Sequence, residues 1–173
     1  MKLVLIGYMG SGKSLIGKTL SQVLGIPFLD LDTFIEKKEG LSISEIFKTK
    51  GEIYFRKKEA SLLQEILSEN TSIILATGGG TPCYGNVMKE LLASETVITL
   101  YLKNSVETLT ERLWLERKKR PLISHLSSKE QLNDFIRKHL FERSFYYNQA
   151  HFSIPCDSFS EMEIVEKIVM ELF

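Results

Sequence analysis

The sequence predicts an α/β fold of three layers, in which helices cover both faces of a parallel sheet. The main observation is that short apolar runs and stretches of helical periodicity alternate five times along the chain. The second is a glycine-rich segment between the first apolar run and the first helical stretch. With 173 residues, 43% of them hydrophobic, the chain is long enough for one core and short for two. We therefore expect a single domain over residues 1–173.

The glycine-rich segment, residues 7–14, fits the pattern G-x-x-x-x-G-K-[ST] of a phosphate-binding loop (P-loop) at every fixed position. The apolar run at residues 3–6 predicts the strand that must precede such a loop, and a helical pattern follows it. The glycines let backbone N–H groups point at phosphate oxygens, and the next helix adds the positive end of its dipole. The alternative is a glycine-rich turn that binds no ligand.

Each residue at the end of the loop has a predicted task. Lys13 would bind the β- and γ-phosphates of a nucleotide, and the Ser14 hydroxyl would ligate Mg²⁺. The nucleotide contacts predicted here are Gly10, Ser11, Gly12, Lys13, Ser14 and Leu15.

The region after the loop predicts a helix and a short strand. Apolar residues recur at helical spacing over residues 16–24, and Gly25 ends the pattern. A strand follows over residues 26–32 and ends in two acids, Asp30 and Asp32. Because side chains alternate along a strand, both carboxylates would point to the same side at its carboxyl end. Ligands bind at that end in open α/β sheets.

The middle of the chain predicts more helix and a third strand. Capping patterns at residues 33–36 and 42–45 open two helices, and Gly51 interrupts the second. A buried strand over residues 72–76 leads into three glycines, Gly78, Gly79 and Gly80. Glycines directly after a strand let a ligand lie against bare backbone. A helix over residues 84–93 and a strand over residues 96–102 follow.

The last third predicts two helices on either side of a basic segment, then a strand and a final helix. These are a helix from about residue 105, the basic segment 117–122, a helix over 128–147, a strand over 151–155 and a helix over 160–172. Basic, exposed segments closed by proline form mobile lids, and we place a lid at about residues 113–125.

Phosphoryl transfer requires that phosphates and metal be held and that the attacking oxygen be aimed. Asp30 is the candidate second group on the metal, through water, because no other apolar run ends in an aspartate. Asp32 would orient the attacking hydroxyl or take its proton. Each aspartate could instead cap a helix.

Two arginines, Arg56 and Arg143, stand on otherwise apolar helix stripes. They could converge on an anionic acceptor as a bidentate clamp. The alternative is a structural ion pair, for instance of Arg56 with Glu52 or Glu59. Arg120, in the lid, could close over the phosphates and stabilise the charge that develops during transfer.

The charge balance argues against a nucleic-acid binder, because 22 basic and 22 acidic residues give a formal net charge of zero. The chain shows neither a signal peptide nor an apolar run that could span a bilayer.

The two cysteines, Cys83 and Cys156, lack metal spacing and predict reduced thiols in a cytoplasmic protein. The three histidines show no metal or triad spacing. We expect a monomer that binds small molecules and no membrane.

Taken together, these motifs resemble those of the shikimate kinase family, P-loop enzymes of aromatic amino-acid (chorismate) biosynthesis. The resemblance covers nearly the whole chain. In order, it rests on residues 7–14, Asp30-Leu31-Asp32, Gly51-Glu52 with Phe55-Arg56, Gly78-Gly79-Gly80, Arg120-Pro121-Leu122, and Glu142-Arg143 before two tyrosines. It implies a nucleoside-monophosphate-kinase-like fold with a five-stranded parallel sheet. It also implies transfer of the ATP γ-phosphate to the 3-hydroxyl of shikimate, giving shikimate 3-phosphate and ADP.

The resemblance also implies roles for individual residues. Asp32 would contact the ring hydroxyls, Arg56 and Arg143 would hold the carboxylate, and the triple glycine would line the same pocket. A shikimate-binding region is expected at about residues 32–60, which include Asp32 and Arg56. On the nucleotide side, it gives phosphate binding to Lys13 and Arg120, Mg²⁺ to Ser14 and Asp30, and adenine stacking to Arg112. The family's other adenine contacts, near residues 156–158, have no match here.

Two rival functions share some of these features. A gluconate-type kinase of small polyols has the same loop and size, but the aspartate pair, the two arginines and the triple glycine argue against it. A regulator that holds ATP without transferring phosphate would give Asp32 no role.

Overall fold

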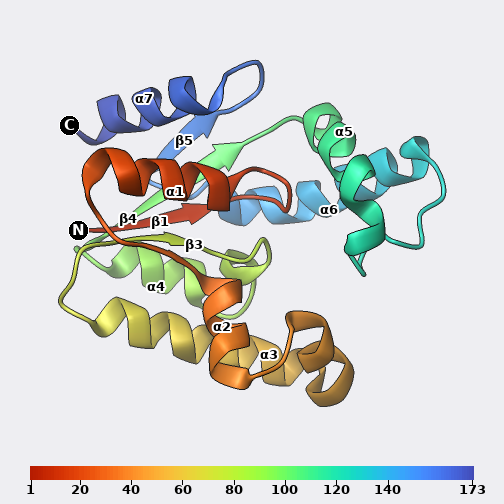
Figure 1. The fold of residues 1–173 in the computed structure, drawn as a ribbon, viewed down its shortest axis with the longest axis horizontal. Coiled ribbons are helices and arrows are strands. Elements are labelled where there is room, and N and C mark those ends of the chain that lie inside the picture. Colours follow the sequence, from red (N-terminus) through yellow and green to blue (C-terminus); the bar gives the residue numbers. More distant parts are fainter.

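The computed structural model describes all residues, 1–173, and contains a five-stranded sheet in the order β2-β3-β1-β4-β5 (Figure 1). All four neighbouring pairs are parallel. The strands are β1 (Lys2–Ile6), β2 (Phe28–Asp30), β3 (Ile73–Ala76), β4 (Val97–Lys103) and β5 (Phe152–Pro155). The predicted parallel sheet is therefore confirmed.

Seven α-helices connect and follow these strands. They are α1 (Lys13–Leu24), α2 (Leu31–Glu39), α3 (Ile43–Ser68), α4 (Val87–Ala93), α5 (Val106–Glu116), α6 (Lys129–Tyr147) and α7 (Glu161–Leu172). Two short 3₁₀ helices, η1 (Thr81–Cys83) and η2 (Arg117–Lys119), complete the chain. None of the helices is both long and apolar enough to cross a membrane.

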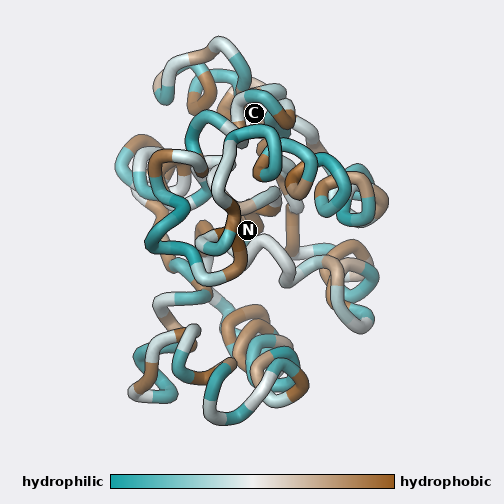
Figure 2. Tube along the Cα trace, turned by 90° about the vertical axis from the view of Figure 1, so that its right-hand side faces the viewer, coloured by the Kyte–Doolittle hydropathy of each residue, from teal (hydrophilic) through white to brown (hydrophobic).

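The helices form layers on both faces of the sheet, as predicted. Because side chains alternate along β1, Leu3 and Leu5 belong to one core cluster, and Val4 and Ile6 to the other. Helices α1 and α7 contribute to the first cluster, and α2, α3, α4, α5 and α6 to the second. In Figure 1, α1 and α7 lie on one side of the strands and α3 and α4 on the other. Hydrophobic and hydrophilic residues alternate along the helices in Figure 2, as expected when one helix face is buried.

The predicted strand over residues 26–32 is wrong at its end. Strand β2 stops at Asp30, whose Oδ1 accepts a hydrogen bond from the Thr33 backbone N–H at 3.2 Å and so caps α2. Asp32 therefore lies in the first turn of a helix, and the two carboxylates do not share a strand face. The physical reason is that Leu31, which the strand pattern also fits, is fully buried as the first residue of α2. The helix start predicted at residues 33–36 lies two residues too late.

Capping residues, a glycine and a proline determine the boundaries of the next helices. The capping pattern at residues 42–45 is confirmed, with reciprocal bonds between Ser42 and Glu45. Gly51 kinks α3 with φ 84° and ψ 169°, a conformation that favours glycine. The helix predicted over residues 84–93 begins only at Val87, because the Pro82 turn η1 precedes it.

A close contact between α1 and β2 places the first site residues together. A Cβ atom at Gly17 of α1 would lie 2.3 Å from Cε2 of Phe28 on β2, so a larger residue here would displace the Phe28 ring that packs between helix and strand. Near the start of α1 and at the end of β2, the Ser14 hydroxyl donates to the Asp30 carboxylate at 2.5 Å. The helix packing thus joins the P-loop to the end of β2.

Candidate active site

A cleft of about 640 Å³ opens at the carboxyl edge of the sheet, where the P-loop follows β1, Asp30 ends β2 and the triple glycine follows β3. This edge is where parallel sheets bind ligands. Most of the predicted site residues line the cleft: Gly10, Ser11, Gly12, Lys13, Ser14, Leu15, Asp30, Asp32, Gly78, Gly79, Arg112 and Arg120. The remaining three, Arg56, Gly80 and Arg143, are not part of its lining.

The P-loop has the backbone that phosphate binding needs. Gly10 and Gly12 adopt φ values of 78° and 92°, which other residues rarely tolerate. Gly12 precedes α1 without any side-chain cap, so the first N–H groups of this helix are free for an anion.

Lys13 is folded back onto its own loop. Its Nζ donates to the carbonyl oxygens of Gly7 at 2.8 Å and Tyr8 at 2.9 Å. Burial lowers the pKa of Lys13 to about 8, although Asp32 and Asp30 act in the opposite direction. The ammonium group is thus poorly solvated, which favours a phosphate as its partner.

Ser14 and Asp30 have the chemistry of a magnesium site. Mg²⁺ prefers oxygen ligands and is usually held by one or two protein groups together with substrate phosphates and water. The hydroxyl and the carboxylate face one another in the cleft, and the bond from Thr33 fixes the orientation of the carboxylate. No group of three or more histidine, cysteine, aspartate or glutamate side chains is placed to hold a metal. The two residues therefore fit an ion whose other ligands are phosphate and water.

The triple glycine brings three predicted side chains together. A Cβ atom at Gly78 would lie 3.0 Å from Oδ1 of Asp32, and one at Gly80 would lie 2.7 Å from a terminal nitrogen of Arg56. At Gly79 it would lie 3.5 Å from a terminal nitrogen of Arg143 and 3.1 Å from the Met9 backbone nitrogen. None of the three glycines has a positive φ, so backbone conformation does not require glycine here. Their missing side chains instead let the charged groups approach the backbone closely.

Asp32 is largely desolvated beside this backbone. Burial and the negative charges of Asp30 and Glu59 together raise its pKa to about 6, although Lys13 acts in the opposite direction. A carboxylate with this pKa can accept a proton near neutral pH. The environment of Asp32 therefore suits the role predicted for it.

Arg56 is held by the protein itself. It donates to the buried Glu59 carboxylate at 2.8 Å, and Glu52 lies 3.7 Å away. Glu59 also accepts a bond of 2.6 Å from the Thr81 hydroxyl, and the Arg56 guanidinium lies 3.9 Å from the centre of the Tyr84 ring. The structural ion pair considered as the alternative is thus present, and it fixes the guanidinium against Gly80. The buried Nε of Arg56, from which the 3.7 Å distance to Glu52 is measured, has no hydrogen-bond partner.

Arg143 differs because no carboxylate lies within ion-pair distance of it. Its guanidinium lies 5.8 Å from the centre of the Tyr8 ring. Burial lowers the pKa of His139, and the charge of Arg143 lowers it further. Arg143 is therefore the free cation beside the triple glycine.

The predicted lid, residues 113–125, includes the end of α5, η2 and the turn after it. Leu113 and Ile123 are fully buried, so this segment is anchored near both ends. Arg120 bonds Glu116 through Nε at 3.0 Å and a terminal nitrogen at 2.6 Å. Arg112 lies nearby, and it donates to the Gly10 carbonyl at 3.1 Å. Both arginines reach the cleft, and movement of the lid stays a prediction.

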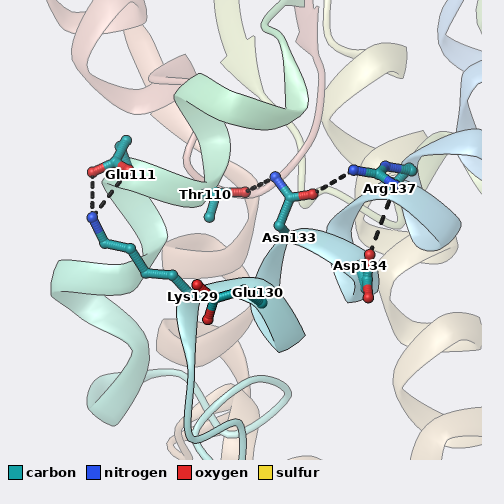
Figure 3. Close-up of a pocket in the computed structure, with 7 residues that line it drawn as sticks. All are labelled: Thr110, Glu111, Lys129, Glu130, Asn133, Asp134 and Arg137. Carbon is teal, nitrogen blue, oxygen red and sulfur yellow. Dashed lines mark hydrogen bonds and ion pairs between the residues drawn. The ribbon is translucent and has the colours of Figure 1, made fainter.

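Helices α5 and α6, which flank the lid, are joined by a polar cluster on the surface (Figure 3). Lys129 pairs with Glu111 at 2.8 Å, and the Asn133 amide donates to the Thr110 hydroxyl at 3.3 Å. This cluster contains none of the predicted site residues. It links the two helices from which the lid extends on the outer surface.

Sequence reasoning missed several residues of the site. Phe159, Glu161 and Ile164, around the start of α7, line the cleft, and the Phe159 side chain is 37% exposed. The nearest sequence signal was the Ser160 capping box that opens α7 directly after this aromatic residue. Glu59 was considered only as a partner of Arg56, and its place next to Gly78 depends on the tertiary fold.

Comparison with known proteins agrees with this geometry. The family model described as shikimate kinase matches residues 9–173. A shikimate kinase of Flavobacterium johnsoniae is 48% identical over 97% of this chain and 96% of its own length. One from Flavobacterium psychrophilum is 46% identical over 99% of both chains.

Solved structures give the same result. A shikimate kinase of Bacteroides thetaiotaomicron superposes with a TM-score of 0.90 at 30% identity, over 99% of this chain and 98% of that one. The shikimate kinase of Acinetobacter baumannii in complex with shikimate has a TM-score of 0.84 at 32% identity, over 99% and 92%. A gluconokinase from Sinorhizobium meliloti, at 17% identity and a TM-score of 0.62 over 99% and 90%, shares the fold alone. The chain therefore belongs to the shikimate kinase family, which comprises ATP-dependent phosphotransferases that act on an alcohol group.

Proposed function

We propose that this chain transfers the γ-phosphate of ATP to the 3-hydroxyl of shikimate, giving shikimate 3-phosphate and ADP for chorismate biosynthesis. The observation that carries the proposal is the convergence of Asp32, Arg56 and Arg143 on the triple glycine beside the P-loop. Two guanidinium groups suit a small carboxylate, and a carboxylate next to them suits the hydroxyl of the same molecule.

On the nucleotide side, the free N–H groups of the P-loop and α1 would bind phosphate oxygens. Lys13 would exchange the carbonyl oxygens of its own loop for the β- and γ-phosphates. Ser14 and Asp30 would hold Mg²⁺, which supplies positive charge to the phosphates when bound. Arg120 would leave Glu116 for the transferring group as the lid closes. Arg112 would lie against the adenine.

On the acceptor side, Arg143 would bind the shikimate carboxylate together with Arg56, which Glu59 keeps in place. The ring hydroxyl would then face Asp32, which aligns it and accepts its proton as the phosphate is transferred. Since transfer requires little covalent chemistry from the protein, holding these groups in line supplies most of the catalysis.

The setting of the enzyme belongs to the same proposal. The free thiols of Cys83 and Cys156 suit the reducing cytoplasm, and the zero net charge suits small-molecule partners in place of nucleic acid. We infer a single kinase domain over residues 1–173 that acts as a monomer.

The two rivals make different demands. A gluconate-type kinase is supported only by a fold-level likeness at 17% identity, against up to 48% for shikimate kinases. A regulator that binds ATP without transfer leaves the desolvated carboxylate of Asp32, with its pKa of about 6, unexplained.

Release of ADP in a coupled assay tests the function and the role of Asp32 together. The wild-type chain should release ADP with shikimate and not with gluconate. Asp32→Asn should abolish turnover and leave the affinity for ATP within about twofold, because the substitution removes only the proton acceptor.

In the wild type, kcat/KM for shikimate should fall about tenfold per pH unit below pH 6, as Asp32 becomes protonated.

Turnover with gluconate alone would rule out the proposed acceptor. Near-normal turnover of Asp32→Asn, or a rate independent of pH between 4 and 7, would rule out the proposed base.

The two arginines should respond differently to removal. Arg143→Ala and Arg56→Ala should each raise the KM for shikimate about 10- to 100-fold, because a charge-assisted bond contributes about 1.5–3 kcal/mol. Arg56→Ala should in addition lower the free energy of unfolding by about 3–5 kcal/mol, because it leaves the buried Glu59 unpaired. Arg143→Ala should leave stability nearly unchanged, since it breaks no ion pair. Steady-state kinetics and urea unfolding measure both effects.

A matched control is Arg137→Ala, which breaks an exposed ion pair with Asp134 and an exposed hydrogen bond to Asn133 and should change neither quantity. An unchanged KM in both site variants would mean that the arginines have a structural role only.

Asp30→Asn should separate the metal role of this residue from its capping role. Asparagine caps a helix as well as aspartate, so the stability of the fold should change little. The Mg²⁺ concentration for half-maximal activity should rise at least about tenfold, because the carboxylate charge is lost. The control is Glu161→Gln, which removes another acid from the cleft lining and should not alter the Mg²⁺ requirement. The same Mg²⁺ dependence in Asp30→Asn and the wild type would contradict the assignment.

A further inference from the structure

Helix α6 presents three polar side chains at successive turns of one face: His139, Arg143 and Tyr147. The Tyr147 hydroxyl donates to the Gly79 carbonyl at 2.5 Å, and Nδ1 of His139 lies 2.8 Å from the Tyr8 hydroxyl. The residues one turn before and one turn after Arg143 thus connect α6 to the two glycine-rich loops of the site. Arg143 stands between these two connections.

Tyr8 and His139 are both uncharged in the hydrogen bond that joins them. Burial raises the pKa of the Tyr8 hydroxyl, which therefore keeps its proton. Burial and the charge of Arg143 lower the pKa of His139 to about 4, so its ring is neutral at physiological pH. The bond therefore joins two neutral side chains beside Arg143.

Tyr8 also belongs to the nucleotide side of the site. It is 1% exposed within the P-loop, and its backbone carbonyl accepts the bond from Lys13. Its ring lies near the Arg143 guanidinium, 5.8 Å from centre to cation. One residue therefore contacts the phosphate-binding lysine through its backbone and the helix of the acceptor arginine through its side chain.

We propose that Tyr8 and His139 are positioning residues, whose hydrogen bond sets the place of Arg143 relative to the P-loop and thereby the affinity for the acceptor carboxylate. The inference rests on the proposed function, in which Arg143 binds that carboxylate. It follows from the absence of any ion pair to Arg143: its place depends on where α6 lies and on the groups around it. Arg56 needs no such device, because Glu59 holds it directly.

The test is a double-mutant cycle of Tyr8→Phe and His139→Leu, with KM for shikimate, KM for ATP and kcat as readouts. Tyr8→Phe removes one hydroxyl and keeps the buried ring. Each single variant should raise the KM for shikimate about three- to tenfold, the effect of one lost hydrogen bond, and leave the KM for ATP and kcat within about twofold. The double variant should be no worse than either single one, because both break the same bond.

Two further variants distinguish positioning from general damage. His139→Gln, whose side-chain amide can form a hydrogen bond with the Tyr8 hydroxyl, should restore most of the acceptor affinity. His151→Leu removes a different histidine, which bonds Thr99 outside the cleft, and should leave the KM for shikimate unchanged.

An unchanged KM for shikimate in Tyr8→Phe and His139→Leu would overturn the inference, as would equal increases in both KM values or additive effects in the double variant. Arg143→Lys distinguishes this failure from failure of the proposed function. If it raises the KM for shikimate while the Tyr8 and His139 variants do not, only the inference fails. If it too has no effect, the acceptor site itself is misassigned.

Discussion

The site depends on the absence of side chains at residues 78–80. Three charged groups from three different helices approach this one stretch of backbone: Asp32 from α2, Arg56 from α3 and Arg143 from α6. A Cβ atom on Gly78 or Gly80 would lie at 3.0 Å or less from one of these groups, too close for an ordinary contact. Because β3 is the neighbour of β1 in the sheet, this stretch also lies beside the P-loop. Acceptor and phosphate can therefore meet at one edge.

The charges at this point are arranged to leave one cation available. Arg56 and Glu59 form a buried pair with no net charge, and Glu59 is fixed in turn by the Thr81 hydroxyl. Arg143 has no such partner and contributes one net positive charge, which matches one carboxylate on the acceptor. Lys13 and Asp32 are both desolvated, so their charges act on bound groups through little intervening water. The same desolvation raises the pKa of Asp32 towards the range that proton transfer needs.

Much of this arrangement could be predicted from local patterns, and the exceptions have physical causes. The alternation of apolar runs with helical stretches predicted the sheet, and the spacing of glycines, Lys13 and Ser14 predicted the loop. The end of β2 was misplaced, because Leu31 fits a buried strand and a buried first helical turn equally well. The contact between Tyr8 and His139 joins residues 131 positions apart, and the place of Phe159 on the cleft depends on how α7 packs on α1. Such contacts leave no local signal.

The most direct measurement is a crystal structure of the enzyme with shikimate and a non-hydrolysable ATP analogue bound together. We expect the shikimate carboxylate to lie about 2.7–2.9 Å from the guanidinium nitrogens of both Arg56 and Arg143. We also expect a ring hydroxyl between Asp32 and the terminal phosphate, with the ring against the backbone of residues 78–80. A carboxylate bound elsewhere in the cleft, or a ring that turns its hydroxyls away from Asp32, would contradict this arrangement.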